Sequence, residues 1–113
     1  MKRAVLYTRV ATIAQDNRTS SLLTQQKQLK AFCKSKGIEI VKCYDEHYSG
    51  ANFNRPAFQA FLEYAEKEHE NIEYLLFVSW DRFSRNFTQT NQMIKKLILW
   101  GINPIAIQNI KRR

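Results

Sequence analysis

The sequence predicts an α/β fold in three layers, in which a mostly parallel central sheet of four or five strands carries helices on both faces. Short apolar runs rich in strand-forming residues alternate along the chain with segments whose apolar residues recur at helical spacing. The connections between them are short, and strands that alternate with helices in this way form parallel sheets with right-handed crossovers. The 113 residues leave room for one such domain.

The first strand and the first helix are predicted in the first third of the chain. Ala4 to Tyr7 is a continuous apolar run that is too short for a helix and suits a strand buried on both sides. A helix over about 21–36 follows, because Ser20 or Ser21 can cap its start and Gly37 suits the position after its end. The apolar stripe of this helix is expected to be Leu22, Leu29, Phe32 and Cys33.

A second strand and a second helix repeat the pattern. Ile38 to Tyr44 has the composition of a strand. After a polar loop, Asn54-Arg55-Pro56 marks a helix start, since proline is favoured in the first turn. This helix is expected to bury Phe58, Phe61, Leu62 and Ala65.

The remaining elements follow in the same order. Tyr74 to Val78 is the strongest strand signal in the chain. A helix is predicted from about Asn86 to Trp100, where Gly101 ends it, and Ile102 to Ile107 forms the fourth strand. The residues of this last helix expected to face inward are Met93, Ile94, Leu97 and Ile98.

Charge is unevenly distributed along the chain. Lysine and arginine number 18 against 10 for aspartate and glutamate, which gives a net charge of +8. Half of the acids lie in one short stretch with Lys67 as its only base, so the rest of the chain carries 17 bases against 5 acids. A basic body of this kind favours a polyanionic partner, nucleic acid ahead of an anionic membrane surface, while the alternative is charge for solubility alone. The clustered acids are Glu63, Glu66, Glu68, Glu70 and Glu73.

Several function classes are disfavoured by what the chain contains. Glycine stands only at positions 37, 50 and 101, so neither a Walker loop nor a dinucleotide-binding fingerprint can be written, and we expect no cofactor. Cys33, Cys43, His47 and His69 lack the paired spacing of a structural zinc site, and we expect no metal. With no disulfide framework, no secretory leader and no apolar run near the roughly 20 residues of a membrane helix, a reducing cytoplasm is the expected compartment.

Ionisable residues follow the predicted strands at one end of the sheet. Strand one leads to Arg9, strand two to Asp45, and strand three to Asp81 and Arg82. The carboxyl ends of parallel strands share one edge, where ligands of such sheets bind. For any single residue the simpler interpretation is an ordinary polar loop, and for the two aspartates a salt bridge. Their joint occurrence points to a functional site.

Two further arginines extend this set and suggest its ligand. Arg85 lies one helical turn beyond Arg82, and Arg55 lies in the loop after strand two. A guanidinium group stays ionised and matches two phosphate oxygens at once, so four arginines with two aspartates suit a phosphate better than general acid and base catalysis. Asp45 at the end of a strand also suggests a phospho-acceptor receiver domain, but no acidic pair follows strand one to hold magnesium.

Four separated motifs in the chain point to a family. They are Tyr7-Thr8-Arg9-Val10-Ala11-Thr12 with Gln15, Ser21-Leu22 with Gln25, Asp45 with Ser49-Gly50 and Arg55-Pro56, and Asp81-Arg82-Phe83-Ser84-Arg85-Asn86. In this order they resemble the catalytic domain of the serine recombinases, the resolvase and invertase family of site-specific DNA recombinases. The likeness runs from residue 4 to about residue 108, and it implies a resolvase-like, mixed but mostly parallel sheet wrapped by helices.

The resemblance also implies a reaction. A serine hydroxyl attacks the scissile phosphodiester of DNA, leaves a 5′-phosphoserine link and a free 3′ hydroxyl, and the strands are exchanged and rejoined without ATP or metal. Arg9, Arg82 and Arg85 would hold the scissile phosphate and stabilise its transition state, while Asp81 would organise the cluster or assist proton transfer. The residues implied to support the pocket are Tyr7, Thr12, Gln15, Gln25, Asp45, Ser49 and Arg55.

One position departs from the family pattern. The family's nucleophilic serine directly follows Arg-Val, and here Ala11 occupies that position, with a methyl group that cannot attack phosphorus. Ala11 is either a deliberate replacement of serine or the residue of a natural lineage whose chemistry has been lost or moved. Thr12 is the nearest hydroxyl, although it is more hindered and its position projects elsewhere. Ser20, Ser21, Ser49 and Ser84 are weaker candidates.

The resemblance further implies partners and a larger context. DNA is the expected substrate, and self-association is expected as a dimer, and as a tetramer in the full-length synaptic complex. In the family a long dimerisation helix and a DNA-binding domain follow, so residues 1–113 are expected to be a fragment. Two alternatives from other classes are a catalytically dead DNA-binding module and a protein-interaction domain that uses the acidic stretch 63–73 or the helix starting near Asn86.

Overall fold

The computed structural model describes residues 2–10, 22–47 and 55–109. Within these ranges four strands form one sheet in the order β2-β1-β3-β4, and every neighbouring pair is parallel. The predicted parallel α/β sheet is therefore confirmed. The strands are β1 (Arg3–Val10), β2 (Glu39–His47), β3 (Tyr74–Phe77) and β4 (Asn103–Ala106).

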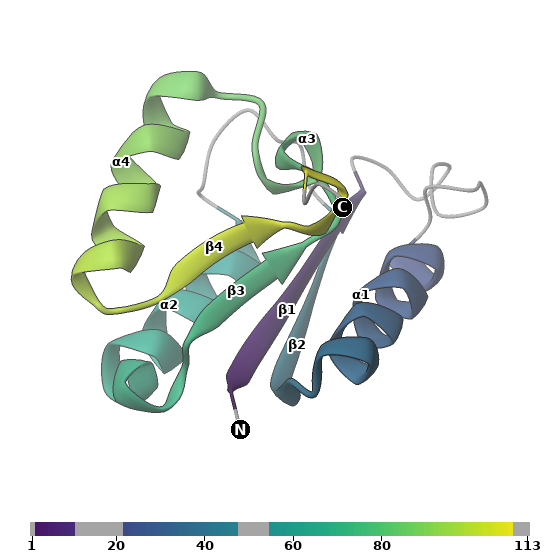
Figure 1. Cartoon of the computed structure of the whole chain (residues 1–113). Coiled ribbons are helices and arrows are strands. Elements are labelled where there is room, and N and C mark those ends of the chain that lie inside the picture. The colour runs from purple at the N-terminus through teal and green to yellow at the C-terminus, as the bar shows by residue number, and fades with distance from the viewer. Residues whose placement is uncertain (1, 11–21, 48–54, 110–113) are drawn as a thin grey trace.

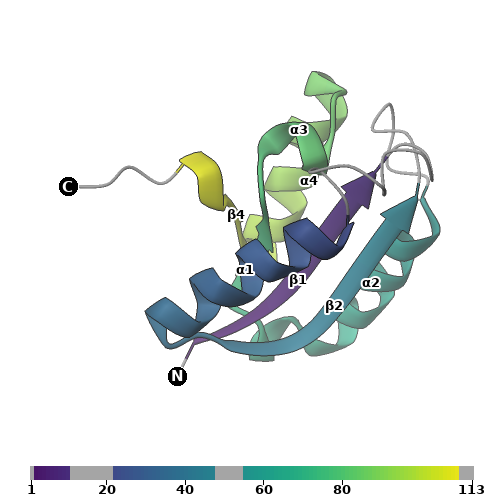
Figure 2. The same cartoon turned by 90° about the vertical axis from the view of Figure 1, so that its right-hand side faces the viewer.

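The long helices cover the two faces of the sheet, as Figure 1 shows. One face carries α1, and the other carries α2 and α4. Figure 2, viewed from the side of α1, shows that helix in front of β1 with α2 behind the sheet. The predicted three layers are confirmed. The helices are α1 (Leu22–Lys36), α2 (Pro56–Glu68), α3 (Trp80–Phe83) and α4 (Phe87–Leu99), with short 3₁₀ turns η2 (His69–Asn71) and η3 (Ile107–Asn109).

Strand β1 is the centre of the core because its alternate residues face opposite layers. Ala4 and Leu6 pack under α1, where Leu29 and Cys33 close a small apolar cluster. Val5 and Tyr7 face the opposite side and join the larger cluster under α2 and α4. A strand covered on both faces needs apolar residues at consecutive positions, which explains the unbroken run in the sequence.

The helix ends follow the local signals. Gly37 and Gly101 adopt positive φ angles of 68° and 80° directly after α1 and near the end of α4, a conformation that glycine reaches without steric cost. Pro56 begins α2, and the side chain of Asn86 caps α4 by accepting the N–H of Gln89 at 3.0 Å. These helix starts and ends lie within one or two residues of the predicted ones.

Two strands extend beyond their predicted bounds. The apolar runs suggested that β1 ends at Tyr7 and β2 at Tyr44, but both strands continue for three more residues, to Val10 and His47. Thr8 and Arg9 pair with Asp45 and Glu46 along this extension. Backbone pairing holds these polar residues in the sheet, and it therefore brings ionisable side chains to its carboxyl edge.

Helix α3 was not predicted, and one residue of α4 was placed wrongly. Helix α3 has only four residues, too few for a helix that is stable alone. Phe83 is fully buried and stacks on Phe77 with ring centroids 4.5 Å apart, so tertiary packing stabilises this single turn. On α4, Leu97 is fully buried whereas Ile98 is 59% exposed. Ile98 lies about 100° around the helix from Leu97, so it faces away from the sheet.

Among the described helices, none is long and apolar enough to span a bilayer.

Candidate active site

The carboxyl edge of the sheet gathers side chains from four parts of the chain. Arg9 lies near the end of β1, Glu46 near the end of β2, and Arg55 directly before α2, while α3 follows β3 after two residues. In Figure 1 the arrowheads of the strands point toward α3. The predicted convergence at this edge is what the parallel topology produces.

Arg9 is the residue that joins these parts. Only 2% of it is exposed, and its guanidinium donates from Nε to the carbonyl of Arg82 at 2.9 Å and from Nη2 to the carbonyl of Asp81 at 2.8 Å. Its backbone is held on the other side by Gln25 of α1, which accepts the Arg9 N–H at 3.2 Å and donates to the Arg9 carbonyl at 3.0 Å. Arg9 thereby ties β1, α1 and α3 together.

A second buried network lies beside Arg9. Arg55 is 1% exposed and donates from Nη1 both to the Tyr7 hydroxyl and to the carbonyl of Phe83, each at 2.8 Å. The Tyr7 hydroxyl donates in turn to Oε1 of Glu46 at 3.0 Å. The same carboxylate accepts the backbone N–H groups of Ala57 and Phe58, both at 2.9 Å. One buried acid therefore caps α2 and orients the Tyr7 hydroxyl that Arg55 binds.

The electrostatics of this region are dominated by positive charge. Burial lowers the pKa of the Arg9 guanidinium below its ordinary value, and the nearby charges of Arg55 and Arg85 lower it further, while Asp81 opposes them. Three arginines from distant parts of the sequence thus lie within electrostatic reach of one another. An anion bound at this edge would relieve their repulsion.

Tyr7 gives a testable pH dependence. Burial is the largest cause that raises the pKa of its phenol well above 10.0, Glu46 adds to the shift, and the charge of Arg55 opposes it. The folded chain therefore keeps this proton where the unfolded chain loses it, so the free energy of unfolding should fall above pH 10 by up to about 1.4 kcal/mol per pH unit. Urea unfolding on both sides of pH 10 measures this slope. Tyr7→Phe should flatten it, and equal slopes in the two proteins would contradict the assignment.

The remaining predicted arginines lie around α3. Arg82 is half-buried and Arg85 is exposed, two residues before α4. The Asp81 side chain is exposed, and its backbone carbonyl is the group that Arg9 binds. Ser84 is buried, and its hydroxyl oxygen accepts the backbone N–H of Asn86 at 3.1 Å. Arg9, Asp81, Arg82 and Arg85 are thus brought to one edge of the sheet.

Asp45 and Glu46 have different positions. The Asp45 side chain is exposed and accepts the Thr8 hydroxyl at 2.5 Å, while Glu46 is buried in the network with Tyr7. Asp45 was predicted to support the pocket, whereas Glu46 was missed. The available signal was the adjacency of two acids at the end of β2, only one of which can face each side of a strand.

Four predicted residues, Ala11, Thr12, Gln15 and Ser49, lie outside the described residues.

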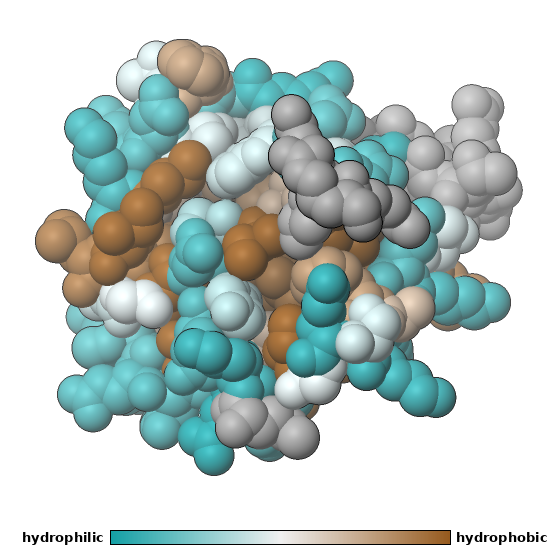
Figure 3. Space-filling model, in the orientation of Figure 1, coloured by the Kyte–Doolittle hydropathy of each residue, from teal (hydrophilic) through white to brown (hydrophobic). Residues whose placement is uncertain are grey.

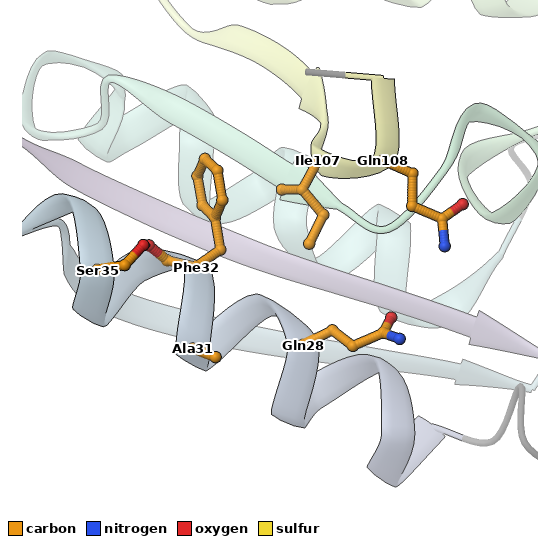
Figure 4. Close-up of a pocket in the computed structure, with 6 residues that line it drawn as sticks. All are labelled: Gln28, Ala31, Phe32, Ser35, Ile107 and Gln108. Atoms are coloured by element: carbon orange, nitrogen blue, oxygen red, sulfur yellow. The ribbon is translucent and has the colours of Figure 1, made fainter. Parts of the chain in front are cut away.

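A separate hollow of about 450 Å³ lies between α1 and η3 (Figure 4). All of its lining side chains are uncharged, and none of them belongs to the arginine cluster (Arg9, Arg55, Arg82 and Arg85). It is therefore not part of the candidate site. The hollow is lined by Gln28, Ala31, Phe32, Ser35, Ile107 and Gln108.

Within the described ranges, no group of three or more His, Cys, Asp or Glu side chains is arranged to hold a metal ion.

Comparison with known proteins identifies the family. The N-terminal catalytic domain of TP901-1 integrase is 27% identical, with a TM-score of 0.87 over 95% of this chain and 79% of that one. A resolvase family site-specific recombinase from Streptococcus pneumoniae shares the fold, with a TM-score of 0.82 and 22% identity over 96% of this chain and 74% of that one. "Uncharacterized immunity region protein 3" of Bacillus phage phi105 is 34% identical over 67 residues, 58% of this chain and 82% of its own length. The model of the family "Resolvase, N terminal domain" matches residues 4–113, and the chain belongs to this family, the catalytic domains of the serine recombinases.

Proposed function

We propose that this domain binds a backbone phosphate of DNA at the carboxyl edge of its sheet. The observation that carries the proposal is the buried pair Arg9 and Arg55, whose guanidinium groups bind the consecutive carbonyls of Asp81, Arg82 and Phe83. The charge of Arg85 also acts on Arg9. Buried like charges are costly unless an anion or another partner compensates them. Glu46 places one negative charge in the network of Arg55, and a phosphate bound by the half-buried Arg82 and the exposed Arg85 would add negative charge beside the buried pair.

The reaction proposed for this site is site-specific recombination by cofactor-free transesterification, and it needs a serine at position 11. The serine oxygen forms a bond to phosphorus as the bond from phosphorus to the 3′ oxygen breaks, and the leaving oxygen takes up a proton. Arg82 and Arg85 would stabilise the charge that develops on the phosphate oxygens, since guanidinium groups match these oxygens in pairs. Asp81 is proposed to receive or relay the proton of the attacking hydroxyl.

The chain as it stands has alanine at this position, so we propose that it binds the phosphate without cleaving DNA. The second candidate function, a DNA-binding module that lost its chemistry, is favoured by the same Ala11. Both functions require the arginine cluster and differ in what a restored serine would do. Self-association into a dimer, and into a tetramer in a longer protein on its DNA site, belongs to the recombinase proposal.

Salt dependence of DNA binding tests the proposed phosphate site. If about four phosphates are contacted, log affinity for duplex DNA should fall against log salt with a slope near −3.6. The double variant Arg82→Gln with Arg85→Gln replaces the two less buried arginines. It should remove about two phosphate contacts and bring the slope to about −1.8. Fluorescence anisotropy of a labelled duplex over a salt series measures both slopes.

The matched control for this experiment is Lys67→Gln, which removes one positive charge from the acidic stretch on α2. It should leave the slope of the parent chain unchanged, because Lys67 lies in the last turn of α2, at the other end of that helix from Arg55, and among acids that repel phosphate. A slope near zero in the parent chain would reject the phosphate site. A slope that Lys67→Gln brings to about −2.7, half of the change expected for the two arginines, would show unspecific attraction instead.

A further inference from the structure

An apolar pocket lies beside the arginine cluster, between α3 and the first half of α4. Its volume is about 350 Å³, within the range of small-ligand sites. Arg85 forms part of its wall, and the charge of Arg85 also acts on Arg9. The pocket therefore adjoins the proposed phosphate site directly. Its lining residues are Trp80, Ser84, Arg85, Phe87, Thr90, Asn91 and Ile94.

Two aromatic rings give this pocket its character. Trp80 is held in place by edge contacts to Phe77 and Phe83, with ring centroids 4.9 and 5.8 Å apart. Phe87, the first residue of α4, is 80% exposed although it is a large apolar side chain. Figure 3 shows a brown apolar band over α4 on the surface of the molecule. The pocket is thus lined by a rigid ring from α3 and an exposed ring from α4, and such rings can stack on a flat ligand.

The polar groups of the pocket are those that recognise the edge of a base. Asn91 is exposed, and its amide both donates and accepts hydrogen bonds. Thr90 donates its hydroxyl proton to the carbonyl of Asn86 at 2.7 Å, which leaves its oxygen oriented as an acceptor. The pocket thus combines stacking faces, an amide, a hydroxyl oxygen and a cation at its rim.

We propose that this pocket binds a nucleobase of the DNA strand whose phosphate occupies the arginine cluster. This proposal rests on the proposed phosphate site and extends it by one nucleotide. Arg85 would contact the phosphate at the rim, and the attached base would stack on Phe87 and Trp80, an arrangement that proteins use to bind unpaired bases. An unpaired or single-stranded base is required, because a base within the duplex presents no free face.

Fluorescence of Trp80 tests the proposal. The chain has two tryptophans, so Trp100→Phe leaves Trp80 as the single reporter. The probes are a short oligothymidylate and an abasic oligonucleotide of the same length and charge. Oligothymidylate should quench Trp80, and the abasic chain should bind more weakly without quenching. Phe87→Ala should weaken binding of oligothymidylate by about tenfold, a typical loss for one stacked base, and leave binding of the abasic chain unchanged.

Leu99→Ala is the matched control, since Leu99 is 87% exposed on the same helix and does not line the pocket. It should leave both affinities unchanged, and Phe87→Tyr should restore the binding that Phe87→Ala loses. Equal binding of the two probes, measured by anisotropy, would overturn the base pocket and leave the phosphate site standing. Binding of neither probe at low salt, together with a duplex salt slope near zero, would overturn both proposals. A Phe87→Ala effect on self-association in sedimentation, without any effect on oligothymidylate, would identify a protein interface instead.

Discussion

Replacing Glu46 by alanine is expected to lower the free energy of unfolding by about 3–5 kcal/mol. The carboxylate accepts hydrogen bonds from Tyr7, Ala57 and Phe58, and the substitution leaves the buried donors of Tyr7 and Phe58 and the half-buried N–H of Ala57 without it. It also removes the acid of the buried network to which Arg55 belongs, since Arg55 and Glu46 both bind the Tyr7 hydroxyl. Urea unfolding monitored by circular dichroism measures the loss.

Asp45→Ala is the matched control for Glu46→Ala. Asp45 is the neighbouring acid, but it is exposed and contacts only the Thr8 hydroxyl among its described hydrogen bonds. Its replacement should cost about 1 kcal/mol, the net value of one hydrogen bond. Glu46→Gln should fall between the two alanine variants, since its amide nitrogen would face a backbone N–H donor. Equal losses for Asp45→Ala and Glu46→Ala would show that the buried network does not stabilise the fold.

Ala11→Ser is expected to change the chain from one that forms no covalent adduct to one that forms a phosphoserine. In the sequence, position 11 directly follows Arg9-Val10, where the recombinase proposal puts the attacking hydroxyl. Arg9 itself is held through its backbone N–H and carbonyl by the side chain of Gln25. An activated phosphodiester, bis(p-nitrophenyl) phosphate, is a suitable probe because it does not require a DNA site. The serine oxygen bonds to phosphorus, p-nitrophenolate leaves, and the hydroxyl proton passes to solvent or to Asp81.

Intact-mass spectrometry and the release of p-nitrophenolate measure this adduct. Adding Arg82→Gln with Arg85→Gln to the serine variant should slow it by about a hundredfold, since these cations stabilise the transition state. An adduct on the unmodified chain would assign the attack to Thr12 or to another serine. A serine variant that binds DNA with the expected salt slope and forms no adduct would favour the module that lost its chemistry.

Much of the fold could be predicted from local chemistry. The apolar run of β1 is unbroken because both of its faces are buried, and the glycines after α1 and α4 mark ends that few other residues allow. The motif with Asp81, Arg82 and Arg85 was recognisable in the sequence alone. By contrast α3 has too few residues to be stable alone, so its formation depends on Phe83 packing against Phe77 and on Arg9 binding its carbonyls.

The choice between Asp45 and Glu46 shows most clearly what the sequence left open. Ala4 pairs with Ile40, but Val5 pairs with Lys42, so β2 carries a bulge at Val41. Val41 and Lys42 therefore lie on the same side, and every later residue of β2 faces the side opposite to the one that simple alternation predicts. Without the bulge, Asp45 would face Tyr7 and Glu46 would face α1.

By itself, then, the sequence determined the order of strands and helices, the parallel sheet and the edge at which the arginines meet, because each depends on local patterns and on the geometry of crossovers. The tertiary structure decided which acid is buried, which arginine binds the carbonyls of Asp81 and Arg82 in α3, and which face of α4 is exposed. These outcomes depend on register and on long-range packing, where a shift of one residue reverses the direction of a side chain.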